Sequence, residues 1–171
     1  MQKIVALLGL VLVFGGCIQT PDWVEPVSDF DAKRYMGRWY EVARLDHRFE
    51  RGLNSVAADY SMDAKGKVTI KNNGYMVKRQ EWRYSEGQAS FVDGPDKGLL
   101  KVSYMWPFYA PYVVFKVDDD YEHAYVCGAD RTTLWLLARE PTVYQEIIDD
   151  FEAEARKLGF DISQVKYIQH L

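Results

Sequence analysis

Few residues of this chain could carry chemistry: two cysteines and three histidines among 171 residues. His47, His123 and His170 lack the close spacing that a zinc site uses. Neither the Gly-x-Ser-x-Gly motif of serine hydrolases nor a phosphate-binding loop occurs in the sequence. Cys127 is the nucleophile left to consider, but no base is evident near it, and such a cysteine usually behaves as a small buried hydrophobe. The sequence therefore favours a protein that is not an enzyme and uses no metal or cofactor.

Cys17 belongs to an N-terminal targeting signal. A short basic start leads into an apolar run that ends at Phe14 and is too short to span a bilayer, which needs about 20 residues. Two glycines and Cys17 follow and resemble the lipobox of bacterial lipoproteins, although Phe14 replaces the usual Leu. In that motif the cysteine is acylated and becomes the new N-terminus. We expect a signal peptide over residues 1–16 and an acylated Cys17; the alternative is a secreted protein with a chance cysteine.

The segment after Cys17 is predicted to be a tether. Residues 17–28 show little pattern and contain two prolines, and an extended chain of this length reaches roughly 35–40 Å. In bacterial lipoproteins an Asp after the acylated cysteine favours the inner membrane, and here that residue is Ile18. This resemblance implies the outer membrane, on its periplasmic side. A lipid on Cys17 also leaves Cys127 without a disulfide partner.

Composition narrows the choice of partner. The formal net charge is −4 and no run of basic residues forms a stripe, which argues against nucleic acid. Aromatic residues make up 15% of the chain. Such a content suits a lined cavity or an amphipathic rim, although a well-filled β-core would use most of these rings as well.

The remaining chain, residues 29–171, reads as one all-β domain with a late helix. Alternating apolar runs separated by turn residues predict eight strands of an antiparallel meander. Their expected ranges are 39–45, 55–62, 68–74, 80–92, 99–105, 112–117, 124–128 and 133–138. A capping box from Thr142 to Gln145 predicts a helix that ends at Gly159, with Tyr144 on its apolar face, and residues 165–168 predict a short final strand.

Four features in order resemble the lipocalins. They are Gly37-x-Trp39 at the first strand, Asp120-Tyr121 at a late hairpin, Arg139 at the end of the eighth strand, and a helix after it. The amino-acid sequence around Trp39 is similar to that of bacterial outer-membrane lipocalins and their apolipoprotein D-like relatives. The resemblance implies an eight-stranded up-and-down β-barrel that holds one small ligand, with the C-terminal helix packed outside. It also implies that Arg139 packs across the Trp39 ring at the closed end.

Strand alternation and the family pattern together predict which side chains line the barrel. If Arg139 faces inward, so do the residues two and four positions before it. Carrying this phase across by the family pattern gives the ligand-binding set Ala58, Tyr60, Ile70, Val102, Tyr104, Tyr112, Val114, Trp135 and Leu137, with Leu100 beside them. About half of these side chains are expected to touch ligand. The bacterial relatives imply a fatty acid or a lysophospholipid.

Two further features leave alternatives open. Residues 105–111 carry three aromatic residues and two prolines and predict an exposed apolar loop at the open end, which could meet the ligand tail, a membrane or a second copy in a homodimer. Glu41 and Lys116 share the inward phase and could form a buried ion pair near the base, unless the strand phase is wrong at these positions. The sequence favours a lipid carrier of the cell envelope. The alternatives are a tethered interaction protein with a filled barrel and, since a few lipocalins are thiol isomerases, an isomerase that uses Cys127.

Overall fold

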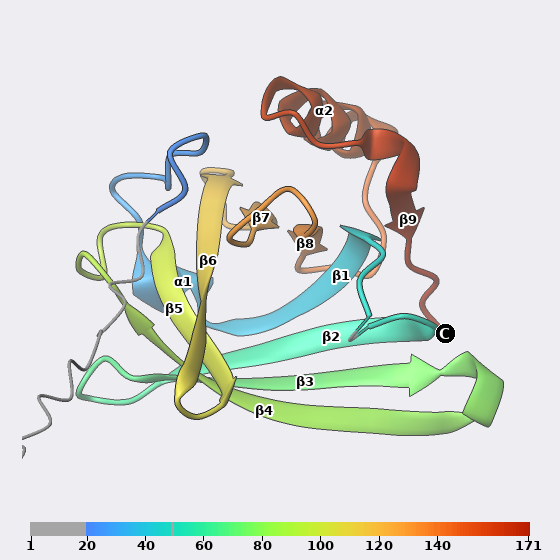
Figure 1. Ribbon diagram of the computed structural model, residues 1–171, viewed down its shortest axis with the longest axis horizontal. Helices are drawn as coiled ribbons and strands as arrows, with labels where there is room; N and C mark the ends of the chain where they lie inside the picture. Colours follow the sequence, from blue (N-terminus) through green and yellow to red (C-terminus); the bar gives the residue numbers. More distant parts are fainter. Residues whose placement is uncertain (1–19, 49) are drawn as a thin grey trace, which may run out of the picture.

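Nine strands form the framework of the part of the chain that the structure describes (Figure 1). The computed structural model describes residues 20–48 and 50–171, so the predicted signal peptide and Cys17 lie outside the described residues. The strands are β1 (Gly37–Leu45), β2 (Leu53–Met62), β3 (Val68–Met76), β4 (Glu81–Phe91), β5 (Leu99–Met105), β6 (Phe108–Val117), β7 (His123–Cys127), β8 (Leu134–Ala138) and β9 (Val165–Tyr167). The helices are α1 (Ala32–Tyr35), η1 (Val77–Arg79), α2 (Gln145–Lys157) and η2 (Ile162–Gln164).

The first eight strands close into a barrel. Each strand pairs antiparallel with the next, and β1 closes the ring by pairing with both β8 and β2. The short β9 pairs with Ala43–Leu45 on the side of β1 away from β8, beyond the point where β2 ends its pairing with β1. The predicted meander and its closure are therefore confirmed. The prediction that residues 105–111 form a loop was wrong in extent, because β6 begins at Phe108 and the β5–β6 hairpin turn contains only two residues.

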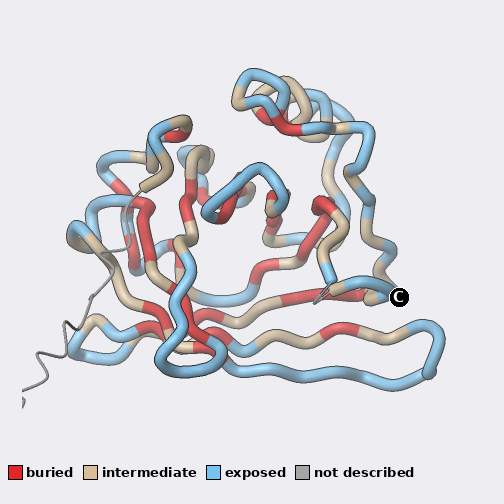
Figure 2. The backbone as a smooth tube through the Cα atoms, in the orientation of Figure 1, coloured by how far each residue is buried: buried red, intermediate tan, exposed pale blue. Residues whose placement is uncertain are grey.

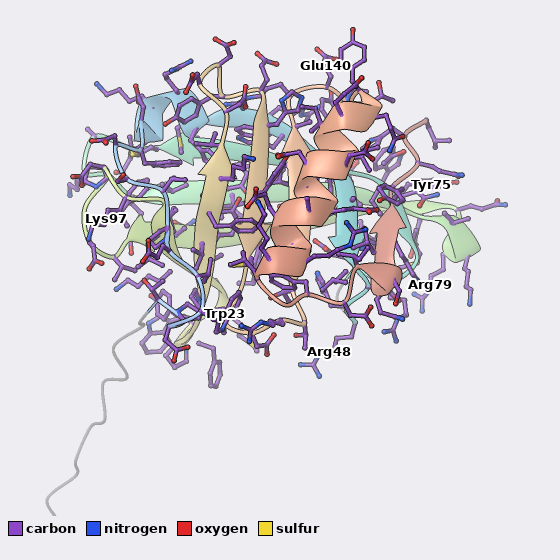
Figure 3. The ribbon with its side chains drawn as sticks, turned by 90° about the horizontal axis from the view of Figure 1, so that it is seen from above. Trp23, Arg48, Tyr75, Arg79, Lys97 and Glu140 are labelled. Carbon is purple, nitrogen blue, oxygen red and sulfur yellow. The ribbon has the colours of Figure 1, made fainter. Side chains whose placement is uncertain are left out.

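The barrel has two distinct ends, which follow from the strand directions. The connections β2–β3, β4–β5 and β6–β7 lie at the end where β1 begins, and α1 lies there as well. The connections β1–β2, β3–β4, β5–β6 and β7–β8 lie at the opposite end. We call the first the closed end and the second the open end. In Figure 3, Glu140, just after β8, lies at the upper edge, and Arg48 of the β1–β2 connection lies at the lower edge.

Helix α2 packs on the outside of the barrel, as predicted (Figure 1). Its buried residues Phe151 and Ala155 lie against the outer side chains of β6, β7 and β8. The predicted start of the helix was wrong. Residues 142–144 are irregular, and the N-cap residue Tyr144 makes no side-chain capping bond and is exposed. The carboxylate of Asp149 instead accepts a hydrogen bond from the Gln145 side chain inside the first turns.

Two apolar clusters hold the fold together, one inside the barrel and one outside it. The inner cluster contains Trp39 and the side chains that the strands point into the barrel. The outer cluster lies between the barrel wall, α2 and the N-terminal segment. Figure 2 shows the buried segments concentrated along the strands, while the β5–β6 hairpin is exposed. Every buried residue of both clusters lies at Val24 or later in the chain.

The described part of the predicted tether lies against the barrel. Val24 is buried against the outside of the barrel wall. The backbone N–H of Val27 donates a hydrogen bond to the Val114 carbonyl at 2.9 Å. Trp23 packs edge-on against Phe160, with their ring centroids 5.6 Å apart. The chain that can act as a free spacer is therefore shorter than residues 17–28. No helix in residues 20–48 and 50–171 is long and apolar enough to cross a membrane.

Candidate functional site: the interior and open mouth of the barrel

The floor of the barrel is plugged by Trp39. Its ring is fully buried, and the guanidinium carbon of Arg139 lies 3.8 Å from the ring centroid, which is a close cation–π contact. The indole N–H donates to the Tyr35 carbonyl at 2.8 Å. Arg139 donates to three backbone carbonyls, those of Arg34, Arg38 and Tyr121. The structure thus brings together the tryptophan and the arginine that the sequence pairs.

The other motif residues surround this plug. Gly37 has φ of +97°, a conformation that favours glycine, and a Cβ there would lie 3.4 Å from the Arg139 guanidinium. Tyr121 is buried, and its hydroxyl accepts a hydrogen bond from the Asp31 backbone N–H at 2.7 Å, which ties the β6–β7 turn to α1. Asp120 is exposed in the same turn. These contacts close the floor.

A chain of three phenols lies directly above the plug. The hydroxyls of Tyr35 and Tyr112 are 2.7 Å apart, and those of Tyr112 and Tyr60 are 3.0 Å apart. Burial raises the pKa of all three phenols above the ordinary value for tyrosine, so they remain neutral. Each hydroxyl can donate one bond and accept others, and the chain therefore provides uncharged hydrogen-bonding groups at the base of the interior.

The predicted lining residues divide by depth. Side chains in the lower part are buried and pack on one another: Tyr60, Ile70, Leu100, Val102, Val114 and Leu137. Ala58, Tyr112 and Trp135 are partly exposed and border this cluster. These nine residues, eight of the predicted set and Leu100, lie in or against the inner cluster, so for them the strand phase carried across by the family pattern agrees with the structure. Tyr104, the ninth residue of the predicted set, does not belong to that cluster. The role of all these residues in binding a ligand stays a proposal, and the lower part of the barrel is largely filled by side chains.

Tyr104 lies at the mouth. Burial raises the pKa of its phenol, yet 55% of the residue is accessible to solvent. A phenol that is desolvated by surrounding protein atoms while part of its ring stays accessible to solvent is typical of a side chain that lines an opening. The ring lies over Gly87, where an added Cβ would be only 2.7 Å from a ring carbon. The Asn72 amide donates to its hydroxyl at 2.7 Å. Tyr104 thus lies flat across the inner faces of β4 and β3.

A buried polar cluster occupies the other side of the interior, and sequence reasoning missed it. Arg44 is 2% exposed and Glu41 is 3% exposed, and the Arg44 guanidinium donates to the Glu41 carboxylate. Arg44 also donates to the backbone carbonyls of Glu50, at 2.6 Å, and Leu53, at 3.2 Å. The cluster therefore fastens the β1–β2 connection to the barrel wall.

Glu50 links this cluster to the apolar lining. Its carboxylate accepts a hydrogen bond from the Trp135 indole at 3.1 Å and lies 2.8 Å from the His47 imidazole nitrogen Nε2. The rings of His47 and Trp135 meet edge to face, with centroids 5.5 Å apart. Burial raises the pKa of Glu50, but the contacts with His47, Trp135 and Arg44 outweigh this and leave the pKa below the ordinary value. Glu50 therefore carries the negative charge of the cluster.

Glu41 behaves in the opposite way. Burial and the nearby Glu50 carboxylate raise the pKa of Glu41 to about 8, and the attraction of Arg44 offsets this only in part. Two carboxylates thus share one buried guanidinium. We infer that one proton stays in the cluster at neutral pH, because two buried like charges oppose each other. The retained proton resides on Glu41.

The predicted pairing of Glu41 with Lys116 was wrong. A bulge between Val114 and Lys116 reverses the strand phase, and the Lys116 ammonium reaches outward to the Asp150 carboxylate of α2 at 2.7 Å. A second bulge, between Glu41 and Ala43, brings Arg44 onto the inner side of β1. Glu41 and Arg44 are three residues apart and would face opposite ways in a regular strand. The signal in the sequence was the pair of opposite charges, Glu41 and Arg44, in the apolar second half of the strand.

Cys127 faces away from the barrel interior. It is buried in the outer cluster, beneath α2, and burial raises the pKa of its thiol to about 12. A neutral, enclosed thiol is a poor nucleophile. Among the described residues 20–48 and 50–171, no three His, Cys, Asp or Glu side chains gather in a way that could hold a metal ion.

These features define a class of protein: an eight-stranded barrel with a plugged floor and an interior that joins an apolar cluster to a buried polar cluster, which is an architecture that can hold one small ligand. A family model described as a lipocalin-like domain matches residues 30–170. The chain belongs to the lipocalin family.

Its curated relatives include bacterial lipoproteins of similar length. The chain is 46% identical over 170 residues to the outer membrane lipoprotein Blc of Vibrio cholerae, an alignment that covers 99% of both proteins. It is 48% identical over 149 residues to the outer membrane lipoprotein Blc of Escherichia coli K12, covering 87% of this chain and 84% of that protein. Among solved structures, insecticyanin from the tobacco hornworm Manduca sexta superimposes with a TM-score of 0.69 at 22% identity, covering 89% of this chain and 86% of that one. That likeness supports the fold alone.

Proposed function

We propose that this protein is a lipid-binding lipoprotein of the bacterial outer membrane, which stores or transports fatty acids or lysophospholipids in the cell envelope. Acylated Cys17 would anchor it on the periplasmic side. Its relatives named outer membrane lipoprotein, at 46% and 48% identity, support this location. The protein acts by binding and not by catalysis, and the enclosed position of Cys127 argues against a thiol isomerase.

The observation that carries the proposal is the partly accessible lining of the upper barrel. Ala58 and Trp135 present partly exposed surface above a buried apolar base, and Tyr112, whose hydroxyl reaches the phenol chain at that base, is partly exposed as well. An acyl chain entering there would replace water on these side chains, and each buried CH₂ would contribute about 0.8 kcal/mol. The filled lower barrel limits how much of the chain can enter. Longer acyl chains would therefore extend toward the mouth.

The polar groups near the mouth suit a head group. Tyr104 and Asn72 already share a hydrogen bond at the inner rim, so their remaining donors and acceptors can meet a carboxylate or a phosphate ester. The Arg44 guanidinium is already used by Glu41 and two backbone carbonyls. We therefore assign the head group to the Tyr104 side of the mouth rather than to Arg44.

A second candidate is a tethered interaction protein whose filled barrel serves only as a scaffold. The tight packing of the lower interior favours it, and the exposed aromatic hairpin could then contact a protein, including a second copy in a homodimer. Native mass spectrometry of the purified domain separates the two candidates. Co-purified lipid, or uptake of a fatty-acid probe after delipidation, supports the carrier. A domain that stays empty when offered fatty acids and lysophospholipids supports the scaffold.

A further inference from the structure

We propose that the open end of the barrel docks on an anionic lipid bilayer, so that the mouth faces the membrane. This inference rests on the proposed function, because it concerns how the anchored protein reaches its lipid ligand. Three independent features of the open end support it: an exposed aromatic hairpin, an excess of basic residues, and the point at which the chain enters the domain.

The β5–β6 hairpin presents large apolar side chains to solvent. Trp106 is 81% exposed and Phe108 is 69% exposed, and Met105 and Tyr109 beside them are exposed as well. Figure 2 shows the tip of the hairpin as a continuous exposed stretch. Water-exposed aromatic residues at the end of a domain suit the interfacial region of a bilayer, where an amphipathic ring has its apolar part in lipid and its polar part in water.

Charge is distributed unevenly between the two ends, although the whole chain is acidic. The connections at the open end carry five basic and three acidic residues: Arg48, Arg51, Lys78, Arg79 and Arg131, with Asp46, Glu50 and Asp130. The connections at the closed end carry three basic and seven acidic residues: Lys65, Lys67 and Lys97, with Asp63, Asp93, Asp96, Asp118, Asp119, Asp120 and Glu122. An anionic surface would therefore attract the open end and repel the closed end.

The chain also enters the domain at the open end. The Arg131 guanidinium of the β7–β8 connection lies over the Trp23 ring, 4.4 Å from its centroid. Trp23 lies at the same lower edge as Arg48 in Figure 3, opposite Glu140. Cys17 is six residues before Trp23, a span of at most about 22 Å. An acyl anchor on Cys17 would hold the open end near the bilayer.

These features favour a lipid surface over a second copy of the chain. In a symmetric dimer formed through the hairpins, the basic connections of the two copies would approach each other and repel. Against an anionic bilayer the same residues are attracted, and the aromatic side chains find an apolar layer. Docking in this orientation would let an acyl chain pass between membrane and barrel with little exposure to water.

The test is vesicle co-sedimentation of the chain from Ile18 onward, which contains the whole described core and carries no acyl anchor. Vesicles of equal parts phosphatidylglycerol and phosphatidylcholine are compared with phosphatidylcholine alone. The variants are Trp106→Ser and the double change Lys78→Glu with Arg79→Glu. Matched controls at the closed end are Tyr144→Ser, a residue that is 83% exposed, and Lys65→Glu with Lys67→Glu. Fatty-acid uptake without vesicles is measured for each protein.

We expect binding to the anionic vesicles that falls about tenfold or more in both open-end variants and stays within about twofold in both controls. Fatty-acid uptake should be unchanged in every variant. Equal binding by all proteins, no binding to the anionic vesicles, or a stable dimer that loses its self-association on Trp106→Ser would overturn the docking proposal. If vesicle binding follows the expected pattern but no fatty acid is taken up, docking stands and the carrier function fails.

Discussion

Replacing Glu41 by Gln tests the buried polar cluster, because glutamine reproduces the protonated form of the side chain. Glu41 faces Arg44, Glu50 and His47 lie beside this pair, and the His170 imidazole lies 2.9 Å from the backbone carbonyl of Glu41. Burial and Glu50 raise the pKa of Glu41 to about 8, compared with about 4.3 for an unperturbed glutamate. We therefore expect the wild type to lose stability, relative to Glu41→Gln, as the pH rises.

The sign follows from proton linkage. Between about pH 5 and pH 8 the folded protein keeps a proton on Glu41 that the unfolded chain has released, so the free energy of unfolding falls as pH increases. Each pKa unit corresponds to 1.36 kcal/mol. At about pH 8 and above, the free energy of unfolding of Glu41→Gln should therefore exceed that of the wild type by an amount on the order of 3–5 kcal/mol. Near pH 5 the two proteins should be about equally stable.

Urea denaturation of both proteins at several pH values between 5 and 9 measures this difference directly. The expected result is a free-energy gap in favour of Glu41→Gln that opens with rising pH. A variant that is less stable than the wild type by the same amount at every pH would refute the reasoning. In that case Glu41 would be ionised throughout, and its salt bridge with Arg44 would stabilise the fold.

Three further experiments, two substitutions and one labelling reaction, test other parts of the structure. Trp39→Ala should destabilise the barrel by about 3–5 kcal/mol, through lost burial and the lost contact with Arg139, whereas Trp39→Phe should cost less; an unchanged urea midpoint would contradict this. Cys127 should react with a thiol reagent at pH 8 only as fast as the protein unfolds, because its thiol is buried with a raised pKa; rapid labelling of the native protein would show otherwise. Gly87→Val should displace Tyr104 and weaken head-group binding without abolishing acyl-chain binding, measured by titration with a fatty acid and with the matching hydrocarbon.

Much of the architecture could be predicted because the strands alternate regularly and the turns contain residues suited to them. The inward phase of Arg139 places Leu137 inside the barrel, and the resemblance to the lipocalins carries that phase to Tyr60 and Val102, where the structure has them. Many such positions indicate the same fold. An error in placing one residue therefore does not change the predicted fold.

The polar cluster could not be predicted because it depends on β-bulges. A bulge adds one residue to a strand and reverses the direction of every side chain after it. Two bulges thus separated Glu41 from Lys116 and brought it next to Arg44. Tyr144 shows a different limit. Helical spacing places it with the apolar residues, but α2 begins only after it, so the ring remains in solvent.

The carrier proposal is tested most directly by titrating the delipidated protein with fatty acids of increasing chain length. A matched pair of variants accompanies the wild type: Ala58→Phe, which fills accessible space inside the barrel, and Ser61→Phe, which adds the same ring on the exposed outer face.

We predict that affinity rises about fourfold for each added CH₂, in line with about 0.8 kcal/mol of transfer free energy, until the accessible part of the interior is full. Ala58→Phe should shorten the chain length at which the gain stops, and Ser61→Phe should leave it unchanged. No binding, affinity independent of chain length, or equal behaviour of the two variants would contradict a ligand inside the barrel.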